Sequence, residues 1–258
     1  MSGRQQKNVK AIILVYIELK KGSQVNSTAL NIRRIQERIA IAAENCGRSA
    51  EEITLLAVSK SFPKESIAQA VDSGVRKFGE NRVQEAEGKI LQFDKSLHLE
   101  WHLIGHLQSN KARRAAELFD LIHSMDNAET AGKLDQACKD LGKILPVLLQ
   151  VKLGGEETKS GADSHNVHEL CEAVSNYKNI RIDGLMAIPP FFDNQNDARP
   201  YFAQLRELGE KLESEQPGCL GRRHLSMGMS HDFEAAIREG ATIVRIGTAI
   251  FGARQYDG

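Results

Sequence analysis

The sequence has no surplus of charge of either sign. Its 258 residues include 34 Lys plus Arg and 34 Asp plus Glu, so the formal net charge is zero. Proteins whose main partner is nucleic acid or an anionic membrane need an excess of basic residues to neutralise phosphate groups. We therefore expect neither nucleic acid nor a membrane as a partner.

Cysteine is scarce, and its spacing argues against a CxxC motif and against a zinc site. The four cysteines are Cys46, Cys138, Cys171 and Cys219. None of them forms a CxxC pair, and no group of them has the spacing of a zinc site. We therefore expect reduced thiols, no bound metal and a cytoplasmic location.

A long apolar run is also missing. The segment 11-AIILVYI-17 is much shorter than the roughly 20 residues of a membrane-spanning helix. The residues ELKKGSQ that follow it contain no small-residue cleavage site of a signal peptide. We interpret residues 1–26 as an extension that is peripheral, poorly ordered or the result of a misassigned start codon. Residues 27–258 then form a single domain.

A repeating pattern of strands and helices follows an amphipathic helix predicted over residues 27–47. Ile32, Ile35 and Ile39 form the apolar face of that helix. From Ile53 onward, short segments rich in β-branched or bulky residues alternate with helical segments. The predicted strands cover residues 55–60, 77–81, 100–105, 121–126, 146–153, 181–188, 223–230 and 243–252. The helices between them begin near Lys64, Val83, Ser109, Ala128, Val167, Ala198 and His231.

Eight strands separated by helices predict an α/β fold, a single closed (β/α)8 TIM barrel with an extra N-terminal helix. A doubly wound open sheet is the competing fold. It usually has fewer strands, and its first strand is typically followed by a GxGxxG turn, which is absent here.

Polar and small residues gather at the predicted carboxyl ends of the strands, where such barrels bind their ligands. Taken singly, each has an ordinary explanation: Lys60 could simply extend into water, and Asn81 could cap a helix. Their convergence on one face predicts a binding site. The residues concerned are Lys60, Glu80, Asn81, His102, His106, Asp126, Met186 and the segments 226–230 and 245–248.

The loops after the last two strands predict a phosphate site. Phosphate groups often bind there in barrels of this kind. Gly228 and Gly247 would let backbone N–H groups approach an anion, and Ser226, Ser230 and Thr248 add hydroxyl groups.

Arg245 and Lys60 narrow the chemistry of this site. Arg245 shares the strand parity of Gly247 and is expected inside the barrel, where it could hold a ring nitrogen or a carboxylate of a ligand. An amine near this cation would have its protonated form disfavoured. A neutral Lys60 forms a Schiff base with an aldehyde, and pyridoxal 5′-phosphate (PLP) carries both an aldehyde and a phosphate.

Other functions remain open on these residues alone. In a Schiff-base aldolase acting on a sugar phosphate, Lys60 would attack the substrate and Glu80 or Asp126 would act as base. Arg245 argues against an aldolase, where it has no evident role. A partner-binding scaffold would instead expose an apolar patch. The basic start of 109-SNKARRAAELF-119 suggests a solvated helix face, or else a surface for the cofactor's phosphate or an acidic client enzyme.

Seven segments together resemble the pyridoxal-phosphate homeostasis protein family (the YggS/PROSC group). They occur in the same order and at compatible spacing from about Asn31 to Arg254, nearly the whole chain. The segments are 57-AVSK-60, 79-GENRVQE-85, 101-WHLIGHLQSNK-111, 159-KSG-161, 184-GLMAI-188, 225-LSMGMS-230 and 244-VRIGTAIFGAR-254.

The resemblance implies a barrel similar to the N-terminal half of alanine racemase, with PLP bound to a lysine as a Schiff base. By motif, Lys60 would be that lysine and Arg245 would face the pyridine nitrogen. Ser226, Gly247 and Thr248 would hold the phosphate. The expected cofactor-binding residues are Lys60, Asn81, Met186, Ser226, Gly228, Ser230, Arg245, Gly247 and Thr248, with His102 as a further candidate.

The resemblance also implies a binding protein with little or no turnover. A guanidinium does not readily protonate the pyridine nitrogen, so the ring is a weaker electron sink than it is beside a carboxylate. Racemases of this fold use a second acid/base from a C-terminal β domain, for which this chain has no room. We therefore expect a role in PLP (vitamin B6) homeostasis, with PLP and PLP-dependent apoenzymes as partners, and a monomer or weak dimer. A PLP-dependent racemase is the alternative.

Overall fold

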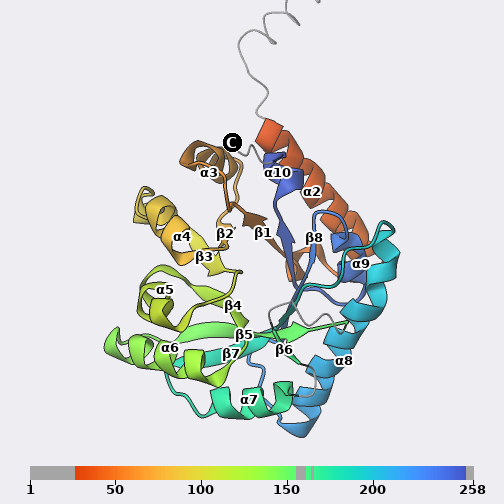
Figure 1. The fold of residues 1–258 in the computed structure, drawn as a ribbon. Helices are drawn as coiled ribbons and strands as arrows, with labels where there is room; N and C mark the ends of the chain where they lie inside the picture. The colour runs from red at the N-terminus through yellow and green to blue at the C-terminus, as the bar shows by residue number, and fades with distance from the viewer. Residues whose placement is uncertain (1–26, 155–160, 164–165, 254–258) are drawn as a thin grey trace, which may run out of the picture.

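Eight short, largely buried segments form the parallel strands of a closed ring. The computed structural model describes residues 27–154, 161–163 and 166–253, and Figure 1 looks down the ring. Each strand pairs with its neighbours, and pairing of β4 with β5 closes the sheet. The ring strands are β1 (Thr54–Val58), β2 (Lys77–Glu80), β3 (Glu100–Leu103), β4 (Leu121–Met125), β5 (Leu145–Lys152), β7 (Ile180–Ala187), β8 (His224–Met229) and β9 (Ile243–Ile246). The predicted barrel is confirmed.

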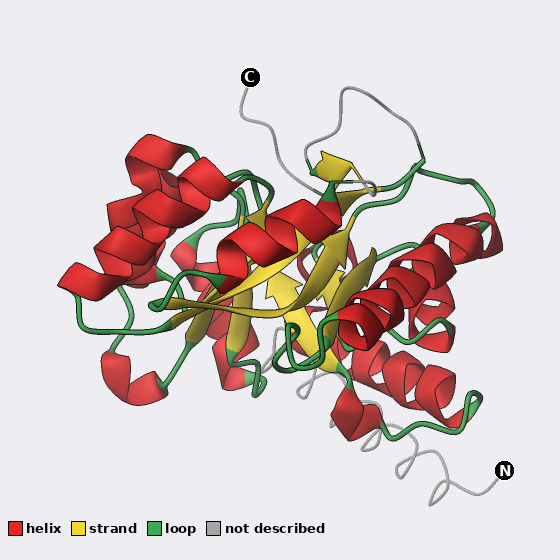
Figure 2. Ribbon diagram, turned by 90° about the horizontal axis from the view of Figure 1, so that it is seen from below, coloured by secondary structure: helices red, strands yellow, loops and turns green. Residues whose placement is uncertain are grey.

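Helices cover the outside of the ring, as Figures 1 and 2 show from two directions. This is the usual way to bury both faces of a parallel sheet. The α-helices are α2 (Ser27–Glu44), α3 (Lys64–Asp72), α4 (Val83–Ile90), α5 (Ala112–Leu118), α6 (Ala128–Asp140), α7 (Val167–Ser175), α8 (Arg199–Glu215), α9 (Phe233–Arg238) and α10 (Thr248–Phe251). Short 3₁₀ turns are η1 (Ala50–Glu52), η2 (Lys95–Leu97), η3 (Ser109–Lys111) and η4 (Gln195–Ala198). No helix in the described part of the chain is long and apolar enough to cross a membrane.

The predicted N-terminal helix is present as α2. Its apolar face is buried at Ile32, Ile35 and Ile39, as its sequence period indicates. The helix contacts α9 and α10, and Asn31 donates a side-chain hydrogen bond to the carbonyl of Ile250 at 3.0 Å. It therefore covers the outside of the ring near β9. The apolar segment 11–17 lies outside the described residues.

The end of the last strand was predicted wrongly, and one short strand was missed. The last strand was predicted to run to residue 252, but β9 ends at Ile246 and the short helix α10 follows. Gly247 (φ −111°, ψ −82°) turns the chain out of the extended conformation, and its carbonyl accepts hydrogen bonds from the amides of Ile250 and Phe251. The short strand β6 (Ala162–Asp163), which pairs with the end of β5, was not predicted at all.

The interior of the ring is only partly apolar. Most of the hydrophobic core lies between the strands and the helices. A small second cluster fills part of the ring's interior and consists of Leu56, Leu121, Leu148, Met186 and Ile243. Buried polar side chains, among them His102, His123, Ser226 and Arg245, accompany it. Since buried polar groups need hydrogen-bond partners, these side chains are expected to bond to one another or to the backbone.

Candidate cofactor site at the carboxyl end of the barrel

Arg245 is held inside the barrel by three hydrogen bonds. Its strand neighbour in the β1–β9 register is Leu56, a residue of the interior cluster, so its side chain faces inward as predicted. Nη1 donates to the carbonyl and hydroxyl oxygens of Ser226 at 2.6 and 2.8 Å, and Nη2 donates to the carbonyl of Ala187 at 2.9 Å. Burial lowers the pKa of Arg245 to about 10, and Asp232 only partly opposes this. The guanidinium is therefore fixed in place by neutral acceptors.

A chain of hydrogen bonds continues from Arg245 across the barrel. His123 Nδ1 lies 2.9 Å from Ser226 Oγ, and His123 Nε2 lies 3.0 Å from His102 Nδ1. Because a guanidinium only donates, the Ser226 hydroxyl is left to donate to His123 Nδ1. His123 then donates from Nε2 to His102, which carries its proton on Nε2. That atom is 3.8 Å from Glu100 Oε2. The network thus assigns both histidines the Nε2–H tautomer.

His123 was missed in the sequence, although a signal for it was present. It lies two residues after Leu121, which belongs to the interior cluster, so alternation along the strand places it inside the barrel. Its partner Ser226 is fully buried with its hydroxyl between Arg245 and His123. Met186, which was expected beside the cofactor, is also fully buried, as part of the interior cluster.

Lys60 lies in a tight turn two residues after β1 ends, rather than within the strand. Ser61, the next residue, has φ +65°, a left-handed conformation that costs energy in a residue other than glycine. The amide of Ser61 donates to Glu85 Oε1 at 2.5 Å, and Lys89 donates to the carbonyl of Ser59 at 2.8 Å. The turn is therefore held from both sides of Lys60.

A buried ion pair completes this support. Lys89 Nζ lies 2.9 Å from Glu80 Oε1 and 2.7 Å from Glu85 Oε1. The Ser59 hydroxyl also donates to Glu80 Oε1, at 2.6 Å, whereas Glu80 Oε2 is buried without a hydrogen-bond partner. Burial raises the pKa of Glu80 above its ordinary value, although Lys89 and Ser59 oppose the shift. The sequence pattern alone gave no role to Lys89 or Glu85.

The loops after β8 and β9 meet as predicted. The Ser230 hydroxyl accepts hydrogen bonds from the amides of Gly247 and Ala249, at 3.3 and 3.4 Å. Gly228 has φ +88°, and a Cβ there would lie 2.6 Å from Ala236 Cβ, so only glycine fits. Backbone amides and a hydroxyl thus converge beside Thr248, the first residue of α10.

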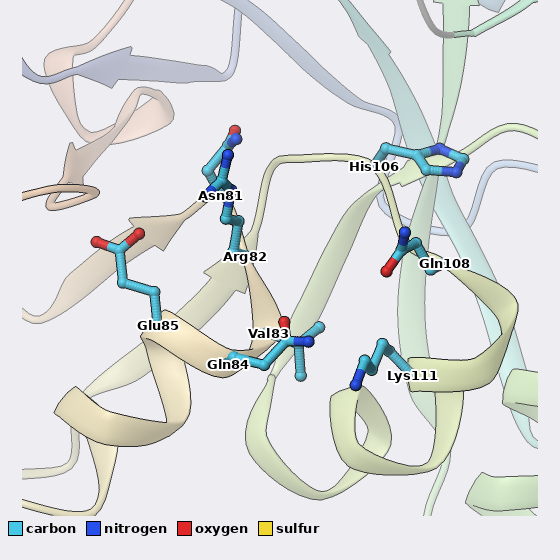
Figure 3. Close-up of a pocket in the computed structure, with 8 residues that line it drawn as sticks. All are labelled: Asn81, Arg82, Val83, Gln84, Glu85, His106, Gln108 and Lys111. Atoms are coloured by element: carbon cyan, nitrogen blue, oxygen red, sulfur yellow. The ribbon is translucent and has the colours of Figure 1, made fainter.

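Asn81 follows β2 directly and borders a cavity of about 590 Å³ between the segments after β2 and β3 (Figure 3). The two segments approach closely, since a Cβ on Gly105 would lie 2.2 Å from the Asn81 carbonyl. Nowhere in the described ranges do three His, Cys, Asp or Glu side chains group as metal ligands would.

Comparison with known proteins decides the family. The chain matches the alanine racemase, N-terminal domain, family over residues 30–255. It is 46% identical over 225 residues to the pyridoxal phosphate homeostasis protein of Aquifex aeolicus, covering 87% of this chain and 97% of that protein. The chain belongs to the pyridoxal phosphate homeostasis protein family. The Escherichia coli K12 member is 45% identical over 235 residues, covering 90% of this chain and 99% of that protein.

Solved structures agree with this assignment. PipY of Synechococcus elongatus, solved with PLP bound, is 40% identical with a TM-score of 0.74, covering 83% of this chain and all of that one. Alanine racemase of Bartonella henselae is 14% identical with a TM-score of 0.64, covering 90% of this chain and 61% of that one, which shows a shared fold alone. The family's features at 159–160 and Arg254 lie outside the described residues.

The residues present fit PLP. The donor-only Arg245 can face a ring nitrogen that lacks a proton, and the amides near Ser230 can face a phosphate. Lys60 stands in a supported turn after a neighbouring strand. The aldolase alternative fits less well, because Glu80 is fully buried and bound to Lys89 and Ser59 rather than open to a substrate.

Acid is expected to destabilise this protein through its buried histidines. Burial lowers the pKa of both His102 and His123. Below about pH 6.5 the unfolded chain takes up protons that the folded protein excludes, so the free energy of unfolding falls by up to about 1.4 kcal/mol per pH unit for each histidine. Urea denaturation at several pH values measures this slope, which is expected to be smaller in His123→Gln.

The matched control is His98→Asn. His98 is exposed and has φ +49°, a conformation that asparagine tolerates. This variant is expected to keep the wild-type slope. An unchanged slope in His123→Gln would show that the buried histidine does not contribute to the pH dependence.

Proposed function

We propose that this protein holds PLP as a Schiff base on Lys60 and takes part in intracellular PLP homeostasis, with little or no turnover of its own. The observation that carries the proposal is Arg245, a guanidinium fixed inside the barrel by Ser226 and Ala187. The PipY structure, with PLP bound at 40% identity, supports the same cofactor.

The roles of the other residues follow from their positions. The Ser230 hydroxyl, which accepts from the amides of Gly247 and Ala249, would donate its own proton to the phosphate, with Thr248 beside it. Gly228 keeps the adjoining loop close to α9. Asn81 would border the cofactor from the end of β2.

Three interior residues support the site from below. Ser226 orients Arg245 through two hydrogen bonds, and we assign it this task in addition to the phosphate contact suggested by its motif. His102 acts at a distance, through His123, and Met186 forms the apolar floor.

Low turnover follows from the same arginine. When bound, PLP supplies an electrophilic aldehyde and a ring that can accept electrons. Arg245 retains its protons because it is a strong base, and so it does not protonate the ring nitrogen as a carboxylic acid would. We therefore propose binding and delivery of the cofactor to apoenzymes in the cytoplasm, by a monomer or weak dimer whose residues 27–258 form one domain.

Borohydride reduction tests the proposal. Treating the protein with PLP and then with borohydride converts a Schiff base into a stable secondary amine, which mass spectrometry of peptides can locate. We expect the label on Lys60. Labelling spread over exposed lysines such as Lys178, with none on Lys60, would contradict the assignment. Racemisation of an amino acid by the purified protein at an ordinary enzymatic rate of about 1–1,000 per second would contradict the low turnover.

A further inference from the structure

Two of the segments that carry the family resemblance face each other across the cavity beside Asn81. Every side chain that borders the cavity belongs to residues 81–85 or 106–111. Figure 3 shows the two walls, with Arg82 and Gln84 on one and Gln108 and Lys111 on the other. The proposed cofactor function uses Asn81 alone among these residues, which leaves the cavity itself without a role.

Two cationic side chains border the cavity without an ion-pair partner in the described part of the chain. Among the described residues, neither Arg82 nor Lys111 forms a salt bridge or side-chain hydrogen bond. Arg82 interacts with Glu85 electrostatically, without direct contact, and this helps to lower the pKa of Glu85. Glu85 itself is bound by Lys89 and by the amide of Ser61. Figure 3 shows its carboxylate turned away from the opposite wall.

Glu85 is ionised, but it forms its ion pair with Lys89 and not with Arg82 or Lys111. Burial raises its pKa, but the hydrogen bonds from Lys89 and Ser61 outweigh burial, so the pKa of Glu85 lies below its usual value. The carboxylate is therefore ionised, and it is bound to the ammonium of Lys89, which also contacts Glu80, rather than to Arg82 or Lys111.

The neighbouring basic residues of α5, unlike Arg82 and Lys111, form ion pairs. Arg113 pairs with Glu117 and Asp140, and Arg114 pairs with Glu87 and Glu117. The basic start of this segment is therefore not a continuous positive patch. Only Lys111, which borders the cavity, keeps an unpaired charge, so the structure favours a small ligand in the cavity over an acidic protein surface lying across the helix.

The remaining lining suits a polar ligand of small size. Asn81, Gln84 and Gln108 each carry an amide that can donate hydrogen bonds. His106 is engaged by Asp126, at 3.3 Å from its Nδ1. A volume of about 590 Å³ lies in the range of small-molecule pockets.

We propose that this cavity is a binding site for a small anionic metabolite, whose phosphate or carboxylate oxygens are held by Arg82 and Lys111. Arginine and lysine bind such oxyanions through charge-assisted hydrogen bonds. The cavity adjoins the turn that contains Lys60, because the wall residue Glu85 accepts the hydrogen bond of Ser61. None of the residues that line it belongs to the loops after β8 and β9, so the inference does not depend on a phosphate bound at those loops.

Backbone amide NMR titration tests the site, with inorganic phosphate and succinate as separate probes at low ionic strength. The full chain is used with and without PLP. We expect saturable shifts at residues 81–85 and 106–111, in both forms of the protein. Preferential binding of one probe identifies the phosphate or the carboxylate as the better oxyanion.

Charge-removing variants provide the second readout. Arg82→Gln and Lys111→Gln are each expected to weaken binding about tenfold, since each removes a charge-assisted hydrogen bond. Lys178→Gln is the matched control, because Lys178 is exposed, precedes β7 and so lies at the other end of the barrel. This control is expected to bind as the wild type does.

Four results would overturn the site. They are no saturation up to about 50 mM of either probe, shifts confined to residues 226–230 and 247–249, equal weakening by Lys178→Gln, or binding of an acidic peptide but of neither small anion. The last result would assign the surface to a protein partner. Failure of the borohydride test at Lys60 would leave this titration unchanged, so the two proposals fail separately.

Discussion

The Lys60→Ala variant is expected to lose the visible absorbance band that the wild type develops with PLP. A Schiff base needs a primary amine, and alanine has none. Any PLP still held by Arg245 and the loops after β8 and β9 would absorb as the free aldehyde. The visible band should therefore disappear completely in Lys60→Ala, even if the variant still binds part of the PLP through these other contacts.

A neighbouring lysine provides the control for this result. Lys64, at the start of α3, places its ammonium 5.7 Å from the centre of the Phe93 ring, away from the barrel interior. Lys64→Ala is expected to keep the band. If Lys60→Ala keeps the band and Lys64→Ala loses it, the Schiff base forms on Lys64 and our assignment of Lys60 is wrong. Absence of the band in the wild type would remove PLP and favour the aldolase.

The Lys89→Met variant is expected to lose about 3–5 kcal/mol of unfolding free energy. Methionine leaves the Glu80 carboxylate in the protein interior with only the Ser59 hydroxyl as a partner. Removing one member of a buried pair costs far more than the pair contributes, because the remaining charge stays desolvated. The turn around Lys60 also loses the bond to the Ser59 carbonyl, so slower reaction of Lys60 with PLP should accompany the loss.

A second lysine–glutamate pair in the same barrel serves as the control. Lys77 and Glu100 are 2.6 Å apart, but their side chains are 37% and 47% exposed. Lys77→Met is expected to cost at most about 1 kcal/mol, as is usual for solvent-exposed pairs. Urea denaturation of the two variants measures the difference. Equal losses in the two variants would mean that burial of Glu80 does not determine the effect. If burial does determine it, the double variant Lys89→Met/Glu80→Gln should recover part of the lost unfolding free energy.

Local sequence pattern determined the barrel and the general position of the site. Strand segments were recognised from runs of β-branched and buried residues, and helices from their spacing, because these periods reflect backbone geometry within a few residues. The face of the site followed from the same geometry, since parallel strands place their carboxyl ends together. The ends of the strands were predicted less accurately. The pattern of 243–252 suits a strand throughout, but Gly247 and the hydrogen bonds to its carbonyl decide where β9 ends.

Only the tertiary structure decided which polar groups act together. His123 lies 103 residues from Ser226, and Lys89 is 30 residues from the carbonyl of Ser59. Such contacts depend on how the whole ring closes, and nothing in the local pattern encodes them. The charges of residues 111–114 look alike in the sequence, yet Arg113 and Arg114 are paired and Lys111 is not. The chain's own residues therefore predicted a lysine and an arginine at one barrel mouth, whereas ring closure determined the neighbours that hold them there.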